Sequence, residues 1–180
     1  LGLVNATGVW GDYELTPSDD SRAFDAAPVL QWSIALPGPA VPSASHAELG
    51  SPLIYGESIY VGYAGDDALL VLDRRNGALL DRLPTGAPVR SKPVVDNDLI
   101  YFSDAAGVTW CYDLGSDTPL WSHEGTAPVL ATPTVLDGRV FVSNVANVLV
   151  ALDANTGELA WRHAQRLDPG RTTELELYGS

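Results

Sequence analysis

The 180-residue chain is long enough for one domain, 46% of its residues are hydrophobic, and its formal net charge is −13. This acidic balance, with Lys92 as the only lysine, argues against nucleic acid or an anionic membrane as a partner. A single cysteine, Cys111, excludes an intrachain disulfide framework and lacks the spacing of a zinc site, and no apolar run approaches the roughly 18 residues of a membrane span.

The N-terminal part of the chain precedes the regular pattern. Residues 1–27 are interpreted as a leader or linker without the basic-then-apolar pattern of a signal peptide, and Asn5-Ala6-Thr7 is a weak match to a glycosylation sequon. Residues 28–36 predict an isolated outer strand that contains Trp32. An insertion within Leu36–Gly50 separates this strand from the next predicted strand.

From residue 51 the chain repeats with a period of about 40 residues, which is typical of propeller blades. In the first copy, β-rich runs separated by turn residues predict four strands at 52–55, 58–63, 68–73 and 78–83. Their equivalents predict further blades, so that the blades span 51–90, 91–130 and 131–166. Residues 167–180 resemble the lead-in to the first copy and predict the start of a missing blade.

The third strand of a copy is apolar without alternation, as in Leu69–Leu72 and Val148–Leu152. A strand of this kind is covered on both faces, which blades stacked around an axis provide. The predicted fold is therefore an all-β propeller of four-stranded antiparallel blades. The chain contributes an incomplete arc of three full blades plus an N-terminal outer strand, cut from a larger ring.

The third copy carries the most specific motif, formed by Ala151, Asp153, Thr156, Gly157 and Trp161. This spacing resembles the tryptophan-docking signature of the pyrroloquinoline-quinone-type (quinoprotein-type) β-propeller repeat family at every defined position. The physical interpretation is a strand that ends in a turn-capping aspartate, a glycine with positive φ, and a tryptophan that returns to cover the neighbouring blade.

The other copies keep the motif in part. The first has Asp73 and Gly77, the second has Asp113 and Trp121, and Trp32 occupies the docking position of the N-terminal strand. Asp81 replaces the tryptophan of the first copy, and Asp117 replaces the glycine of the second. Both departures are interpreted as repeat decay.

A candidate binding face is indicated by strand order, because the loops after the second and fourth strands of every blade lie at one end. Variable loops on a rigid scaffold are common binding sites. The candidate residues at this end are Asp66, Asp67, Arg90, Lys92 and Asp104.

Few residues in the sequence indicate a catalytic or metal-binding site. His123 and His163 occupy equivalent outer-strand positions, but no cluster completes a metal shell around them. Cys111 is expected to be a small buried residue, and the tryptophans are expected to pack rather than to form an aromatic cage. We predict no catalytic, cofactor-binding or metal-binding residue in this chain.

The resemblance implies a non-catalytic extracytoplasmic or periplasmic scaffold that binds a protein partner through loops on one propeller face. It is similar in this to the lipoprotein propeller of outer-membrane barrel assembly. The first alternative is a fragment of a quinone-dependent alcohol or sugar dehydrogenase, which would need pyrroloquinoline quinone and calcium. The second is the extracytoplasmic sensor domain of a membrane kinase. In each case the arc is expected to self-associate through uncovered blade faces.

Overall fold

A computed structural model describes residues 30–34, 50–63 and 65–164 of the chain. The chain divides into two compact units, residues 1–31 and 32–180, and every described strand belongs to the second unit. The leader 1–27, the sequon at Asn5, most of the insertion after Leu36 and the lead-in 167–180 lie outside the described residues.

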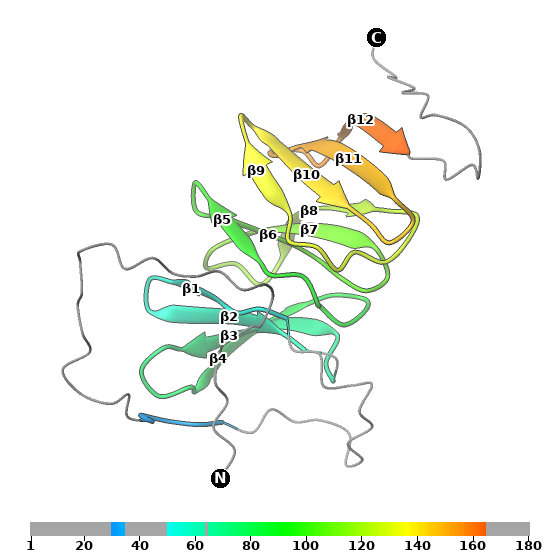
Figure 1. Cartoon of the computed structure of the whole chain (residues 1–180). Coiled ribbons are helices and arrows are strands. Elements are labelled where there is room, and N and C mark those ends of the chain that lie inside the picture. The colour runs from blue at the N-terminus through cyan, green and yellow to red at the C-terminus, as the bar shows by residue number, and fades with distance from the viewer. Residues whose placement is uncertain (1–29, 35–49, 64, 165–180) are drawn as a thin grey trace, which may run out of the picture. The chain divides into compact units, whose positions relative to one another are not determined.

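Within the described residues, twelve strands form three four-stranded antiparallel sheets, and each sheet is one blade (Figure 1). The first blade consists of β1 (Leu53–Tyr55), β2 (Ser58–Gly62), β3 (Ala68–Asp73) and β4 (Leu79–Pro84). The second consists of β5 (Val94–Asp96), β6 (Leu99–Ser103), β7 (Val108–Asp113) and β8 (Pro119–Glu124). The third consists of β9 (Thr134–Leu136), β10 (Arg139–Ser143), β11 (Val148–Asp153) and β12 (Leu159–Ala164).

The strands lie in chain order within each sheet, and none of the described residues forms a helix. The predicted all-β architecture of four-stranded blades is therefore confirmed, with strand bounds in the first blade within one residue of those predicted. No helix in the described part of the chain is long and apolar enough to cross a membrane.

Tight turns join the first two strands of each blade because their residues accept a left-handed backbone. Asn97 and Asp98 have φ values of 49° and 61°, and Asp137 and Gly138 have 50° and 72°. Positive φ at both central residues of a two-residue loop is the geometry of a type I′ turn, whose twist matches that of the strands. The Asp-Gly pair at 137–138 is the strongest sequence signal for such a hairpin.

The blades bury their apolar side chains in shared layers. One layer joins the first and second blades through these buried residues: Tyr60, Leu69, Val71, Leu83, Val89, Ile100, Phe102 and Tyr112. A second layer joins the second and third blades: Tyr101, Cys111, Trp121, Val129, Val140, Val142, Leu152 and Ala154. Alternate residues of a strand therefore face opposite layers.

The third strand of the first blade shows why its apolar run does not alternate. Leu69 and Val71 belong to the layer shared with the second blade, whereas Leu70 and Leu72 belong to a separate buried cluster with Val61. The four side chains of this run are at most 8% exposed. Both faces of β3 are covered, as the sequence predicts.

Residues 30–34, within the segment predicted as an outer strand, form no regular secondary structure. A strand requires a neighbour that pairs with its backbone N–H and C=O groups. Each of the three described sheets consists of four strands from later in the chain, and none of these strands pairs with residues 30–34.

Candidate functional site

Trp121 on β8 docks on the turn between β11 and β12 of the third blade. Its indole Nε1 donates a hydrogen bond to the carbonyl oxygen of Ala154 at 3.0 Å, and the residue is 9% exposed. A Cβ added to Gly157 would come within 2.5 Å of the indole ring, so the ring lies directly on this backbone. Gly157 supplies both the left-handed φ of 72° and the space for the ring.

Trp32 makes the same contact with the first blade. Its Nε1 donates to the carbonyl oxygen of Arg74 at 3.1 Å, and a Cβ added to Gly77 would lie 2.7 Å from its ring. Gly77 has the same φ of 72°. Trp32 therefore occupies the predicted docking position, although its own segment is not a strand.

The motif aspartates shape these turns. Asp153 Oδ1 accepts hydrogen bonds from the backbone N–H groups of Asn155 at 2.9 Å and Thr156 at 3.0 Å. These two bonds stabilise the carboxylate and lower the pKa of Asp153 below its ordinary value. Asp73 similarly accepts from the N–H of Arg75 at 2.6 Å. The motif residues thus act in turn formation and blade packing.

Two further motif residues complete the third blade. Ala151 is fully buried and lies opposite Trp161 in the strand register. Trp161 is half-buried and lies 5.9 Å from the ring of Phe141, measured between ring centroids. A small residue at 151 leaves room beside the large ring.

The turn of the second blade departs from this pattern. Gly115, with a φ of 117°, takes the left-handed conformation two residues before Asp117, which stands in the glycine position. Asp113 keeps the motif aspartate and is exposed. Asp81 of the first blade is opposite Val71 beside a β-bulge, as Trp121 is opposite Cys111. Asp81 is therefore the structural equivalent of a docking tryptophan.

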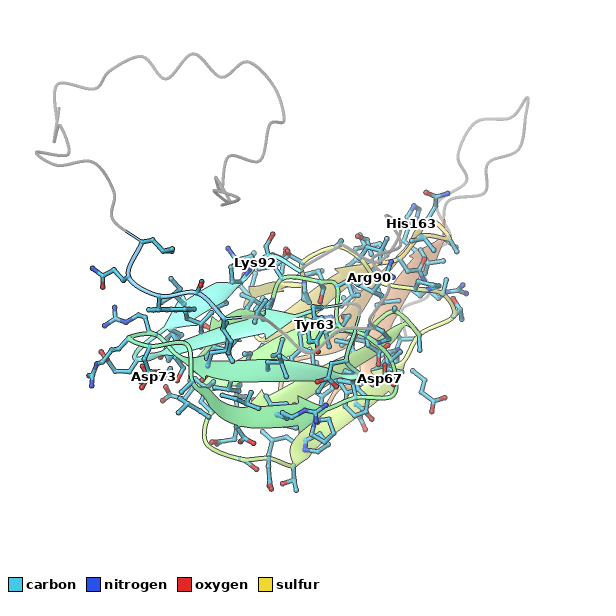
Figure 2. The ribbon with its side chains drawn as sticks, turned by 90° about the horizontal axis from the view of Figure 1, so that it is seen from below. Tyr63, Asp67, Asp73, Arg90, Lys92 and His163 are labelled. Atoms are coloured by element: carbon cyan, nitrogen blue, oxygen red, sulfur yellow. The ribbon has the colours of Figure 1, made fainter. Side chains whose placement is uncertain are left out.

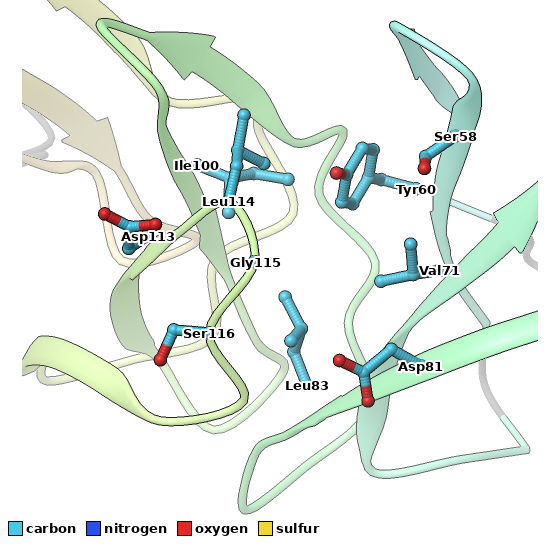
Figure 3. A pocket seen from close by; sticks show the side chains of 10 residues that line it. All are labelled: Ser58, Tyr60, Val71, Asp81, Leu83, Ile100, Asp113, Leu114, Gly115 and Ser116. Carbon is cyan, nitrogen blue, oxygen red and sulfur yellow. The ribbon is translucent and has the colours of Figure 1, made fainter.

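A cavity of about 150 Å³ lies where this tryptophan would dock (Figure 3). It is lined on one side by Asp81 and Leu83, and on the other by Leu114, Gly115 and Ser116. The sequence did not predict this cavity, because Asp81 and Asp117 were each interpreted as decay of a separate repeat. The signal that could have found it is that the first blade lacks its docking tryptophan, while the turn of the second blade that would receive it also departs from the motif.

The predicted binding face lies at the other end of the blades. Figure 2 shows Asp67 and Asp73 at opposite ends of the first blade. The connection between the first two blades, residues 85–93, packs against the end of β2, because a Cβ on Gly62 would meet the backbone of Val89 at 2.2 Å. This contact brings the loop with Asp66 and Asp67 close to the connection.

The candidate residues on this face differ in exposure. Lys92 is exposed and Arg90 is half-buried, on either side of Ser91, whose buried hydroxyl donates to the carbonyl oxygen of Ser103 at 2.8 Å. Asp67 is exposed, whereas the half-buried Asp66 forms an ion pair with Arg82. This hydrogen bond anchors the backbone between Arg90 and Lys92.

Asp104 is fully buried and is not offered to a partner. Its Oδ1 accepts from the backbone N–H groups of Ala106 at 2.9 Å and Val108 at 3.0 Å, and its Oδ2 accepts from the Trp110 indole at 2.9 Å. Because its carboxylate forms the turn after β6, Asp104 is not part of the candidate surface.

Cys111 and the histidines are not brought together. Cys111 is fully buried between the second and third blades, and burial raises the pKa of its thiol to about 12, which disfavours the reactive thiolate. His123 and His163 lie on β8 and β12 of different sheets. The described residues contain no group of three or more metal-ligating side chains.

Comparison with known proteins bears on the whole arc. The family described as outer membrane protein assembly factor BamB matches residues 15–124 and 71–176. The serine/threonine-protein kinase AfsK of Streptomyces griseus is 32% identical over 132 residues, which cover 66% of this chain and 16% of the kinase. The chain spans 28% and 16% of the lengths of two curated relatives.

Solved structures share the fold. BamB from Moraxella catarrhalis aligns with a TM-score of 0.56 and 22% identity, over 64% of this chain and 36% of BamB. The quinohemoprotein alcohol dehydrogenase ADHIIG from Pseudomonas putida HK5 aligns with a TM-score of 0.65 and 22% identity, over 81% of this chain and 24% of the enzyme. The family match extends over most of the sequence and agrees with the docking motif in the blades. The chain therefore belongs to the BamB family of pyrroloquinoline-quinone-like β-propeller repeat proteins.

Proposed function

We propose that this chain is part of a non-catalytic, extracytoplasmic scaffold that binds a protein partner. The observation that carries the proposal is the match to the BamB family over residues 15–124 and 71–176. The role of the motif residues also supports the proposal, because their carboxylates and indole N–H groups form hydrogen bonds within the turns and between the blades. The formal net charge of −13 favours a protein partner over nucleic acid.

The proposed surface is the end that carries the connection 85–93 and the loop with Asp66 and Asp67. Arg90 and Lys92 are the cationic residues of that connection, and they lie on either side of the anchored Ser91. A rigid connection that presents charges can bind a partner without a large loss of loop entropy. We therefore assign Arg90 and Lys92 to contacts with carboxylates of the partner.

The test places a photo-crosslinking amino acid at Lys92 of the full-length protein in its own cell, with the same substitution at Arg75 as control. Arg75 is also an exposed cation, but it lies at the opposite end of the first blade, next to Asp73. We expect one defined adduct from position 92 that is absent from position 75. It should be lost in the R90E/K92E double variant when the crosslinker is moved to Ala87. Adducts of equal yield from both positions would contradict the proposed surface.

A second candidate function is a quinone-dependent dehydrogenase, favoured by the alignment to ADHIIG over 81% of this chain. The only thiol of this chain, Cys111, is buried between two blades and so cannot stack on a cofactor. Titration of the full-length protein with pyrroloquinoline quinone and calcium, followed by tryptophan quenching and dye-linked alcohol oxidation, distinguishes the two. Saturable quenching with turnover would establish the enzyme and contradict the scaffold.

The similarity to AfsK supports a third candidate, the sensor domain of a membrane kinase. The coding sequence of the whole protein decides this possibility. A kinase domain and a membrane span joined to the propeller would replace the scaffold proposal with a sensor.

A further inference from the structure

The cavity between the first and second blades is an unfilled tryptophan-docking site. The two equivalent turns are each covered by an indole, that of Trp32 on Gly77 and that of Trp121 on Gly157. Asp81 stands at the position from which the first blade would send a tryptophan to the second. The chain therefore builds three docking turns but fills two of them with its own tryptophans within the described residues.

The walls of the cavity suit an aromatic ring. Tyr60, Val71 and Leu83 line it from the first blade, and Ile100 and Leu114 line it from the second (Figure 3). Ser58, Asp81, Asp113 and Ser116 add polar groups to these walls, and a volume of about 150 Å³ is enough for a benzene-sized ring. Burial of such a ring is favourable because it removes apolar surface from water.

One polar group is placed for an indole. In the filled sites the indole N–H donates to the carbonyl oxygen of the residue directly after the motif aspartate, Arg74 or Ala154. Leu114 is that residue in the second blade, and it lines the cavity. Its carbonyl oxygen is the expected acceptor for an indole N–H.

The cavity differs from the filled sites by the carboxylate of Asp81, which stands where they have a tryptophan, whereas Asp113 is the motif aspartate that the filled sites also contain. Asp81 and Asp113 are both exposed and both line the cavity. The ion pairs among the described residues involve Glu57 and Asp66 as the acids, so neither of these two carboxylates is used in one. Two carboxylates beside the cavity favour a ligand in which a cationic group lies next to the aromatic ring.

We propose that this cavity binds a tryptophan side chain, flanked by a basic residue, from a partner polypeptide. The inference rests on the proposed scaffold function and adds the chemistry by which a partner is recognised. The partner's indole completes the blade interface in the way that Trp121 completes the next one, and its basic residue pairs with Asp81 or Asp113.

The test titrates the ¹⁵N-labelled full-length protein with the peptide acetyl-Lys-Trp-Lys-amide and follows the backbone amide shifts. We expect saturable shifts at Leu114, Gly115 and Ser116. Replacing the peptide's tryptophan with alanine should weaken binding by at least about tenfold, because the buried ring supplies most of the apolar contact. Acetyl-Glu-Trp-Glu-amide should also bind more weakly because of the two carboxylates.

Two matched variants locate the site. D81W places an indole from the chain itself in the cavity and should abolish the shifts. L80W adds the same side chain one residue earlier, where Leu80 is 55% exposed, and should leave binding within about twofold. D81N should weaken binding about two- to fivefold through the lost charge.

Several results would overturn the inference. Shifts that miss residues 114–116, equal binding of the alanine peptide, or undiminished binding to D81W would each contradict it. The wild-type shift map decides the question even if D81W fails to fold. If the peptide binds here but the full-length protein gives no adduct at position 92, the proposed surface fails alone. If D81W binds no peptide but keeps the position-92 adduct at full yield, the partner does not need the cavity. In that case the inference fails and the proposed surface stands.

Discussion

Gly157 and Gly138 have the same φ of 72°, but they differ in what lies above them. A Cβ on Gly157 would meet the Trp121 ring at 2.5 Å, whereas a Cβ on Gly138 would meet nothing within 4 Å. Alanine at either position therefore experiences the same backbone strain, and only alanine at 157 also displaces the ring. The pair separates the two roles of a docking glycine.

We expect G138A to lower the free energy of unfolding by about 1 kcal/mol through the left-handed backbone. G157A should lower it by a further 1–3 kcal/mol, roughly the range for overpacked sites. Urea denaturation of both variants measures the difference. Equal losses would mean that the ring moves aside without cost.

Trp121 is expected to be the most costly single side chain to remove from the second interface. W121A should lower the free energy of unfolding by about 3–5 kcal/mol, because it creates a cavity and removes the shorter of two side-chain hydrogen bonds to the Ala154 carbonyl. L120A alters the adjacent residue, which is 56% exposed, and should change the free energy of unfolding by less than about 0.5 kcal/mol. A small loss in W121A would contradict the role of docking in stability.

The buried thiol of Cys111 should make the free energy of unfolding depend on pH. Its pKa is raised to about 12 by burial, so the folded state keeps the proton that the unfolded chain releases near its ordinary value of 9.0. The stability contribution is therefore fully present below pH 9 and is lost as pH rises toward 12. Urea midpoints at pH 7 and pH 10 should fall more for the wild type than for C111A. An equal fall would show that the thiol is not protected.

At the scale of elements, the interface between the first and second blades lacks the tryptophan that closes the interface between the second and third. D81W should fill the cavity and raise the free energy of unfolding by about 0.5–2 kcal/mol, the range for cavity-filling changes. L80W should give no gain, because Leu80 is 55% exposed. Thermal unfolding of the two variants checks this, and destabilisation by D81W with no change in L80W would show that the cavity cannot accept an indole.

The strands themselves could be predicted because the period of about 40 residues, the turn residues and the apolar runs all agree. Gly77 and Gly157 indicated their turns from the sequence alone. The burial of Asp104 could not be predicted in the same way, because an aspartate in a loop appears identical whether it faces solvent or caps a turn. Its three internal hydrogen bonds depend on the positions of Ala106, Val108 and Trp110.

The cavity and the N-terminal segment show another limit of the sequence. The cavity exists only where two blades meet, so it depends on Asp81 of one blade facing the turn at Leu114, Gly115 and Ser116 of the next, which the sequence does not show. Trp32 docks on the turn of the first blade, whereas residues 30–34 form no strand. Side-chain docking needs a single turn as receptor, whereas a strand needs backbone pairing with a sheet, and residues 30–34 pair with none of the three described sheets.

At the scale of the whole chain, exposed apolar side chains accompany a strongly acidic composition. Leu136, Val145 and Leu159 of the third blade are each at least 50% exposed. We expect residues 1–180 to self-associate, more strongly at high salt, because salt screens the repulsion between chains of net charge −13. Sedimentation equilibrium at low and high salt measures this, and a monomer under both conditions would contradict it.

The direction of docking has a consequence for synthesis on the ribosome. Trp121 precedes its acceptor Ala154 by 33 residues, and Trp32 precedes Arg74 by 42. At roughly 5–20 residues per second, each indole waits about 2–8 s for the turn that will cover it. The nascent chain thus matures from its N-terminus, with one uncovered indole carried forward until the next blade has left the exit tunnel.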